Sequence, residues 1–305
     1  MRIVMALGGN ALLPREAAPE HDVQRRHIAE SAAAIADIAR RHEVIITHGN
    51  GPQIGLLALQ ALAHTNVAPY PLDVLGAQTQ GMLGYLIAQA LTNHLGESRV
   101  AAVLTQARVN PLDPAFKKPS KPIGPIYSDT QVRELAARRA WTFTRDGAGW
   151  RRALPSPEPL EILELPAIRS LTDAGFIVVC CGGGGIPVVK QSGNTWTGVE
   201  AVIDKDLTSA LLATHLGADG LLLLTDIDAV YADWPTRNQP IDEITPELLR
   251  QYKFDAGSMN PKVEAASRFV EQTGGFASIG QLTEASALLT GRRGTRVSAS
   301  KPDLH

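Results

Sequence analysis

The sequence has few of the features that assign a protein to a class at first sight. Its 305 residues include two cysteines, and because Cys180 and Cys181 are neighbours they cannot form a disulfide that closes a loop. We expect two buried, unreactive thiols in a protein of a reducing compartment. The net charge of -2, with a pI near 6.5, gives no overall attraction to nucleic acid or to membrane surfaces.

Long apolar runs are missing too. No segment approaches the roughly 20 apolar residues that span a bilayer, and the run IVMAL at residues 3–7 is too short for the apolar region of a signal peptide. The hydrophobic share of 44% and the charged share of 20% are globular values, which exclude a disordered or fibrous chain. We predict a cytoplasmic protein without nucleic-acid or membrane partners.

Two common nucleotide-binding fingerprints, GxxxxGK[ST] and GxGxxG, do not occur. The segment HGNGPQIG spaces Gly49, Gly51 and Gly55 differently, and no acidic residue ends the following strand. Walker-type and NAD-binding interpretations therefore lose support. The eight histidines show no metal-ligand spacing, so we predict no structural metal and expect His48 to be a packed or hydrogen-bonded loop residue.

The chain does contain one unit used repeatedly, a short apolar run that ends in glycines. Helical patterns with an apolar face lie between these runs. The alternation predicts an α/β fold, with a mostly parallel sheet between two helix layers and ligands bound outside the carboxyl ends of the strands. The glycine-ended runs are RIVMALGGN, EVIITHGNGP and FIVVCCGGGGIP, and a fourth run, GLLLLTDIDAVY, ends in acidic residues instead.

The helical patterns have recognisable ends. The first covers residues 23–39, and the second covers 76–95 and is closed by Gly96. We predict Asp206 and Asn260 as N-caps of two later helices. The second helix is rich in small residues, which would allow close approach of either another helix of this chain or a second copy; these residues are Gly76, Ala77, Gly81 and Gly84.

Residues 115–156, here named the flap, depart from this rhythm. Prolines are too dense around its start for helix or sheet interior. Ser128 and Gln131 form a capping-box pair that opens a short helix, and WTFTRDGAGWRRAL predicts a hairpin. Between residues 110 and 160, nine Lys and Arg face five Asp and Glu. The flap is predicted to stand off the sheet as a basic cover that suits a phosphate ligand.

Glycine turns and lysines together indicate an anion site. Turns that follow parallel strands converge at one edge of a sheet, where glycines leave backbone N–H groups free for an anion. Lys205 lies between Asp204 and Asp206 at a predicted helix start. Lys262 lies in the first turn of another helix, where the helix dipole repels a cation unless an anion is near. We predict that the anion is a phosphoryl group.

Several motifs together resemble one family. In order they are ALGGNALL, HGNGPQIG, QGMLGY, KPSKPIGP, SPEP, CGGGGIPV, GVEAVIDKD and GSMNPKVEAA. They resemble carbamate kinase, a branch of the amino acid kinase superfamily, from Arg2 to about Val297. The resemblance implies a single amino acid kinase-like domain over residues 1–305, a three-layer αβα sandwich, and a homodimer.

The resemblance also implies an activity, reversible phosphoryl transfer between ATP and carbamate that gives ADP and carbamoyl phosphate. The nucleotide would carry Mg²⁺, and the reaction would run toward ATP in arginine catabolism of the deiminase type. Ala6 and Leu7 stand where relatives such as acetylglutamate kinase carry a lysine, and the resemblance implies that Lys121 of the flap supplies that cation.

Site residues follow from the matching motifs. Lys121, Lys205 and Lys262 would contact the phosphates, and Asp206 would orient lysines. The small substrate and the transferring group would lie among Gly8, Gly9, Asn10, Gly49, Asn50, Gly51, Gly183 and Gly184. The nucleotide would lie near Asp226, Tyr231, Ala256 and Met259.

Other functions stay open from the sequence alone. A kinase of the same superfamily could act on another small acid, an acylamino acid or a nucleoside monophosphate, although HGNGPQIG shows no cation for a larger acceptor. A nucleotide-binding protein without turnover is a second alternative, but such proteins lose the lysines that are present here. An NAD-dependent oxidoreductase is disfavoured by the missing fingerprint.

Overall fold

A computed structural model describes most of the chain. The described residues are 1–13, 20–63, 66–96, 99–139, 141–147, 149–233, 236–254 and 259–299, without the side chains of Asn10, Ala11, Pro125 and Arg138. In this part of the chain no helix is long and apolar enough to cross a membrane.

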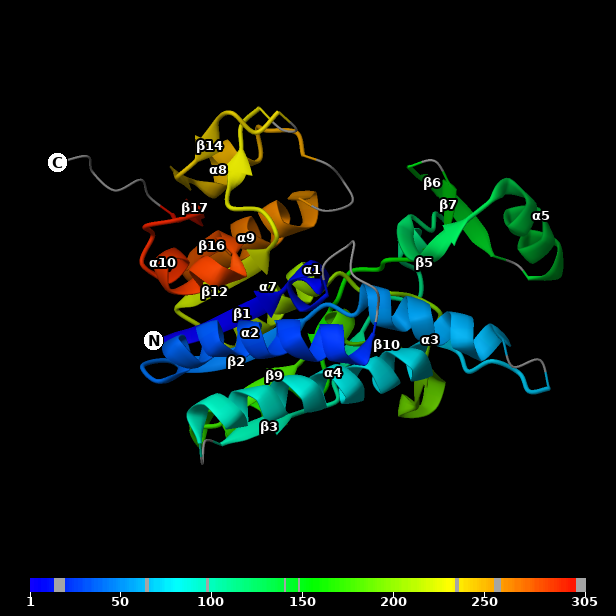
Figure 1. Ribbon diagram of the computed structural model, residues 1–305, viewed down its shortest axis with the longest axis horizontal. Helices are drawn as coiled ribbons and strands as arrows, with labels where there is room; N and C mark the ends of the chain where they lie inside the picture. Colours follow the sequence, from blue (N-terminus) through cyan, green and yellow to red (C-terminus); the bar gives the residue numbers. More distant parts are fainter. Residues whose placement is uncertain are drawn as a thin grey trace.

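An eight-stranded sheet forms the middle of the molecule (Figure 1), with the order β15-β17-β16-β12-β1-β2-β9-β3. Five successive pairs, from β16–β12 to β9–β3, are parallel, whereas β17 is antiparallel to β16. The strands are β1 (Arg2–Leu7), β2 (Glu43–His48), β3 (Val100–Ala102), β9 (Ile177–Cys180), β12 (Gly220–Thr225), β15 (Glu243–Ile244), β16 (Phe276–Gln281) and β17 (Thr295–Val297).

Helices cover both faces of this sheet, which makes the predicted three-layer αβα sandwich. Alternate residues of β1 enter different cores because strand side chains alternate between faces. Ile3 and Met5 pack with α2 (His21–Ala39), α4 (Leu72–Leu95) and α10 (Ala285–Leu289). Val4 and Ala6 pack with the layer of α6 (Leu165–Asp173), α7 (Lys205–Leu216) and α9 (Met259–Thr273).

The four apolar runs singled out in the sequence are neighbours in the sheet, as β12, β1, β2 and β9. Their register places Leu7 beside His48 and Leu224, and Thr47 beside Cys180. The four strands therefore end at one level. The residues that follow them form a common edge, at which every glycine turn of the prediction lies.

The observed helix ends correct two predictions. Helix α7 is capped by Asp204, whose side chain accepts the Asp206 N–H, so Asp206 is the second helical residue and its carboxylate is free for other partners. Helix α9 already begins at Met259, which places Asn260 inside its first turn. The expected Gly96 C-cap of α4 is present. Three further short or exposed helices are α1 (Gly9–Leu12), α3 (Gly51–Ala63) and α8 (Pro246–Leu249).

Within the flap, a separate three-stranded sheet in the order β5-β7-β6 stands off the main body (Figure 1). Its antiparallel β6–β7 pair forms the predicted hairpin, and the Ser128–Gln131 capping box opens α5. The flap leans on α3, where a Cβ added to Gly55 would lie 2.8 Å from the Gly124 Cα. The elements are β5 (Lys121–Tyr127), α5 (Asp129–Arg138), β6 (Thr142–Asp146) and β7 (Gly149–Leu154).

The remaining elements are two small sheets and four short turns. A four-stranded sheet has the order β11-β10-β4-β8, and β13 pairs with β14. Their bounds are β4 (Gln106–Arg108), β8 (Glu161–Ile162), β10 (Ile186–Lys190), β11 (Trp196–Gly198), β13 (Val230–Tyr231) and β14 (Pro240–Ile241). Short 3-10 turns are η1 (Pro114–Phe116), η2 (Gly182–Gly184), η3 (Ser192–Asn194) and η4 (Leu282–Glu284).

Candidate active site

The glycine turns after β1, β2 and β9 meet at the carboxyl edge of the sheet, as predicted from the order of the runs. The Gly49 N–H donates to the Leu7 carbonyl at 2.9 Å, and a Cβ added to Gly49 would lie 2.9 Å from the Gly9 nitrogen. A Cβ added to Gly183 would overlap the Asn50 amide, at 2.3 Å from its Nδ2. Larger residues would therefore push these turns apart.

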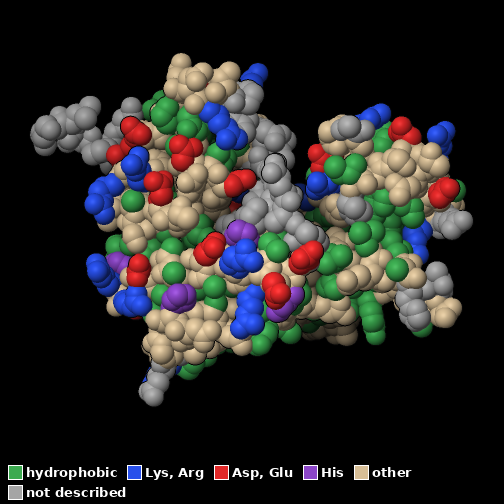
Figure 2. Space-filling view, viewed as in Figure 1, with side chains coloured by type: hydrophobic (Ala, Val, Ile, Leu, Met, Phe, Trp, Pro, Cys, Tyr) green, Lys and Arg blue, Asp and Glu red, His purple; other side chains and the backbone are tan. Residues whose placement is uncertain are grey.

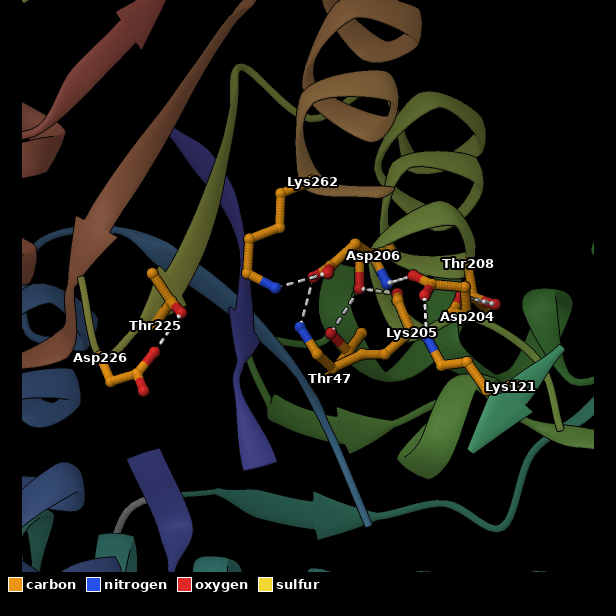
Figure 3. Close-up of polar contacts among 10 residues, drawn as sticks. Thr47, Lys121, Asp204, Lys205, Asp206, Thr208, Thr225, Asp226 and Lys262 are labelled. Atoms are coloured by element: carbon orange, nitrogen blue, oxygen red, sulfur yellow. Dashed lines mark hydrogen bonds and ion pairs between the residues drawn. The ribbon is translucent and has the colours of Figure 1, made fainter. Parts of the chain in front are cut away.

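Two lysines from distant parts of the chain meet on the carboxylate of Asp206 (Figure 3). The Lys205 Nζ donates to Oδ1 at 2.5 Å, and the Lys262 Nζ donates to Oδ2 at 2.9 Å. The side chains of Lys205, Lys262 and Asp206 are 10%, 12% and 5% exposed. The first turns of α7 and α9 thus place two ammonium groups on one buried carboxylate.

Burial and charge act in opposite directions on these groups. Burial alone would raise the pKa of Asp206, but the positive charges of Lys205 and Lys262 outweigh it and hold that pKa well below its usual range. The pKa of Lys205 is lowered, first by burial and then by repulsion from Lys262. Burial also lowers the pKa of Lys262, yet the negative charge of Asp206 outweighs it and the pKa is raised. At neutral pH Asp206 is ionised, and the site carries concentrated positive charge.

The third predicted lysine reaches the same helix start from the flap. The Lys121 Nζ donates to Asp204 Oδ2 at 2.6 Å, while Oδ1 of the same carboxylate accepts the Asp206 N–H at 2.9 Å. Figure 3 shows Lys121 and Lys262 approaching the start of α7 from opposite sides. The Lys121 side chain is 32% exposed, about three times as much as that of Lys205 or Lys262.

Most other flap cations have local partners. Arg151 pairs with Asp146, and Arg152 pairs with Glu200 while stacking over the Trp141 ring. On the face shown in Figure 2, acidic and basic side chains are interspersed over both body and flap. Two cations of the predicted basic cover are thus held in ion pairs, and Lys121 is a flap cation that reaches the start of α7.

Buried hydroxyls support the lysines, and no motif in the sequence pointed to them. Ser209 Oγ donates to the Lys205 carbonyl at 2.7 Å and lies 2.6 Å from Thr47 Oγ1. Thr208 Oγ1 donates to the Gly184 carbonyl at 2.9 Å, which ties η2 to α7. Thr47, Thr208 and Ser209 are fully buried. In the sequence, these three residues could be recognised only as polar residues within apolar stretches, close to a glycine turn or to the charged triplet at residues 204–206.

His48 is a buried, hydrogen-bonded residue, as expected. It is 1% exposed, and its Nδ1 lies 3.0 Å from the Gly49 carbonyl, which can only accept, so Nδ1 carries the proton. Burial, opposed by the hydrogen bond to Gly49 and assisted by the Lys205 charge, lowers its pKa to about 4. His48 is therefore neutral and supports the turn after β2.

The residues predicted to contact the nucleotide do not form one cluster as the lysines and aspartates do. Asp226 is exposed, accepts a hydrogen bond from Thr225 Oγ1 at 3.0 Å and faces Lys262 across the site (Figure 3). The Tyr231 hydroxyl donates to Asp228, and Met259 is fully buried in the core beneath α9. Ala256 lies outside the described residues, as does the side chain of Asn10.

This arrangement can bind and neutralise a phosphoryl group. The cluster holds three ammonium groups against two carboxylates, beside glycine turns and a helix N-terminus. Phosphoryl transfer needs positioning and charge neutralisation more than a protein nucleophile. Among the described residues, no group of three or more His, Cys, Asp or Glu side chains could hold a metal ion.

Such a site on an αβα sandwich is that of a phosphoryl-transfer enzyme, and comparison with known proteins agrees. The sequence model of the Amino acid kinase family matches residues 1–278, so the chain belongs to that family.

Within the family, the chain belongs to the carbamate kinases. It is 48% identical over 308 residues to the carbamate kinase of Rhizobium meliloti, with 100% of this chain and 95% of the relative covered. It is 47% identical over 300 residues to that of Haemophilus influenzae, with 98% and 97% covered. The structure of Giardia lamblia carbamate kinase bound to AMP-PNP matches with a TM-score of 0.89 at 38% identity, over 97% of this chain and 98% of that one.

Proposed function

We propose that this protein transfers a phosphoryl group reversibly between ATP and carbamate, giving ADP and carbamoyl phosphate. The observation that carries the proposal is the pairing of Lys205 and Lys262 on buried Asp206, beside the glycine turns that end β1, β2 and β9. Carbamate is already an anion, so its oxygen can attack without a general base.

Each lysine has a separate place around the migrating group. Lys205 and Lys262, held on opposite oxygens of Asp206, flank it from the body, and Lys121 reaches it from the flap. Charge builds on the equatorial phosphoryl oxygens in a loose transition state, and fixed ammonium groups and backbone N–H groups offset that charge. Asp206 orients the two body lysines and remains ionised throughout.

The small substrate is proposed to lie among Gly8, Gly9, Asn10, Gly49, Asn50 and Gly51. Gly183 and Gly184 complete this wall, since Gly183 lies against Asn50 and the Gly184 carbonyl accepts a hydrogen bond from Thr208 in the first turn of α7. The nucleotide, with the Mg²⁺ that it carries as part of the substrate, is proposed to lie toward Asp226, Tyr231, Ala256 and Met259. Exposed Asp226 is suitably placed to face the metal or the ribose.

A homodimer is proposed through α4 and the edge strand β3. Three large apolar side chains are exposed on α4 and just after β3, with Tyr85 at 59%, Leu104 at 54% and Met82 at 37%. A cavity of about 210 Å³ is lined by Tyr85 and Leu104 and partly by Gly81 and Gly84. Light scattering should give twice the chain mass for the wild type and one chain mass for a Tyr85→Glu, Leu104→Glu double variant.

The protein is further proposed to act in the cytoplasm and toward ATP, in arginine catabolism of the deiminase type. The flap, residues 115–156, is proposed as a unit that carries Lys121 to the site. These statements are supported by family membership and by the position of Lys121 on β5.

The deciding experiment is ATP formation from carbamoyl phosphate and ADP by purified protein. A Lys205→Met variant purified in the same way controls for contaminating kinases. N-acetylglutamate and UMP, offered with ATP, test the other acceptors of the superfamily. ATP formation by the wild type alone supports the proposal, whereas no ATP from carbamoyl phosphate, or faster phosphorylation of another acceptor, overturns it.

A further inference from the structure

Two adjacent residues in the middle of α4 hold two of the glycine turns. Thr79 Oγ1 accepts a hydrogen bond from the Asn50 Nδ2 at 2.8 Å, which fixes the turn after β2. Gln80, the next residue, contacts the turn after β9. Both side chains are buried. Gln80 opens the QGMLGY motif, but the motif alone assigned it no role.

The Gln80 carboxamide makes three hydrogen bonds. Its Nε2 donates to the Gly182 carbonyl at 3.0 Å and to the Thr105 carbonyl at 3.1 Å, while its Oε1 accepts the Thr105 N–H at 2.8 Å. A Cβ added to Gly182 would lie 2.9 Å from the Gln80 Cγ, so turn and side chain fit closely. Gln80 thereby joins the loop before β4 to the loop after β9.

The turn that Gln80 contacts includes a residue in an unfavourable backbone conformation. Cys181 adopts a left-handed conformation with φ 51°, which residues other than glycine rarely adopt and which persists only where the surroundings enforce it. The Cys181 N–H donates to Thr105 Oγ1 at 3.0 Å, and the backbone of Thr105 is in turn fixed by Gln80. Removing the carboxamide would release both supports of this turn together.

Peptide geometry gives the contact a chemical consequence. In a trans peptide the C=O and the N–H point in opposite directions, so a Gly182 carbonyl directed at Gln80 turns the Gly183 N–H away from α4. Within the described part of the chain, the Gly183 N–H has no acceptor. Gly183 lies against the Asn50 amide, between the turns of the candidate active site.

We propose that Gln80 is a positioning residue for phosphoryl transfer, which fixes the Gly182–Gly183 peptide so that the Gly183 N–H donates to an oxygen of the transferring group. This inference rests on the proposed function and extends it from the lysines to a buried amide of α4. Gln80 itself does not touch the substrate.

The main test compares Gln80→Met with Gln89→Met on the same helix. Gln89 is half-buried and donates to the Tyr85 hydroxyl at the proposed dimer surface, so its change leaves the contacts of the glycine turns in place. Loss of one aligned donor typically lowers kcat by about 10²-fold. We expect a fall of about that size for Gln80→Met with KM for ADP unchanged, and wild-type kinetics for Gln89→Met. Wild-type kcat in folded Gln80→Met would overturn the proposal.

A second variant covers the case in which Gln80→Met does not fold. Gln80→Glu keeps the acceptor for Thr105 N–H and regains a donor only when the carboxyl is protonated, which burial favours. Its kcat relative to wild type should therefore rise as pH falls from 8 to 6. A ratio that stays constant with pH contradicts the proposal.

A third measurement does not depend on turnover. Amide hydrogen exchange of residues 182–185 in the unliganded protein should become faster in the Gln80 variants and stay unchanged in Gln89→Met. An inactive wild type would remove the proposed function and leave this test in force, whereas unchanged exchange in the Gln80 variants would remove the positioning role.

Discussion

The body half and the flap half of the site use the same kind of ion pair in different surroundings. In the body half, Lys205 and Lys262 are nearly enclosed and share one carboxylate. In the flap half, Lys121 is one-third exposed and pairs with Asp204 alone. Charges removed from water depend strongly on their partner, whereas exposed pairs contribute little.

The difference teaches that the two halves are suited to different tasks. Asp206 cannot be lost without leaving two buried ammonium groups unpaired, so the body half is fixed before any substrate arrives. Lys121 can leave Asp204 at small cost, so the flap half can adjust to what binds. The following variants test this division, from the largest expected effect to the smallest.

Asp206→Asn should lower the free energy of unfolding by about 3–5 kcal/mol at pH 7, because it leaves Lys205 and Lys262 without a counter-charge. Asp204→Asn is the matched change in the flap half and should cost about 1 kcal/mol, since its lysine can turn to water. Urea unfolding of both variants provides the measurement. Equal losses would erase the distinction between the halves.

Acid should lower the free energy of unfolding through His48. Its pKa is about 4 in the folded protein and 6.5 in an unfolded chain, so below pH 6.5 the unfolded state binds a proton that the folded state does not. The stabilisation is complete above pH 6.5 and is lost as pH falls toward 4, by roughly 3 kcal/mol in total.

Unfolding free energies of wild type and His48→Gln, measured between pH 7 and 4, should therefore converge by about that amount. Parallel curves for His48→Gln would show that the buried imidazole has no part in acid sensitivity.

Lys205→Met should lower kcat by ~10² or more, which corresponds to about 2.7 kcal/mol in the barrier, while nucleotide affinity changes little. The lysine is fixed on Asp206, and in the proposed function its charge offsets that of the migrating group. Steady-state kinetics with carbamoyl phosphate and nucleotide titration give the two numbers. Unaltered turnover would contradict the assigned role.

Lys121→Met should lower turnover with little change in the free energy of unfolding. Lys121 is one-third exposed, and buried Asp204 keeps the Asp206 N–H as a hydrogen-bond donor, so the free energy of unfolding should change by about 1 kcal/mol. Turnover should nevertheless fall, since Lys121 is the flap cation placed at the site. A loss of stability as large as that of Asp206→Asn would show that the flap is part of the fixed half.

The apolar runs and their glycines predicted the sheet and the meeting of the turns well, because parallel topology leaves few choices for where strand ends lie. The caps were predicted less well. Asp204 and Asp206 are the same residue type two positions apart, and sequence alone does not say which one caps α7 and which one binds lysines. Helix α3 was overlooked because its apolar residues follow a glycine-rich segment and few of them are buried.

Residues that act through partners distant in the chain were missed for another reason. Gln80 lies in the apolar helix α4 and gains its meaning from Thr105 and Gly182, 25 and 102 residues away. Thr47 and Ser209 meet across 162 residues. No local pattern marks such pairs, whereas a lysine between two aspartates is conspicuous in the sequence itself.

Asp204 has one further consequence, which follows from how its two oxygens are divided. Oδ1 caps the N-terminus of helix α7 and Oδ2 accepts a hydrogen bond from Lys121, so the two contacts are made by different oxygens. An anion that draws Lys121 away from Oδ2 leaves the hydrogen bond between Oδ1 and the Asp206 N–H in place. Loss of the Lys121 contact would therefore leave the first turn of α7, which carries Lys205, capped.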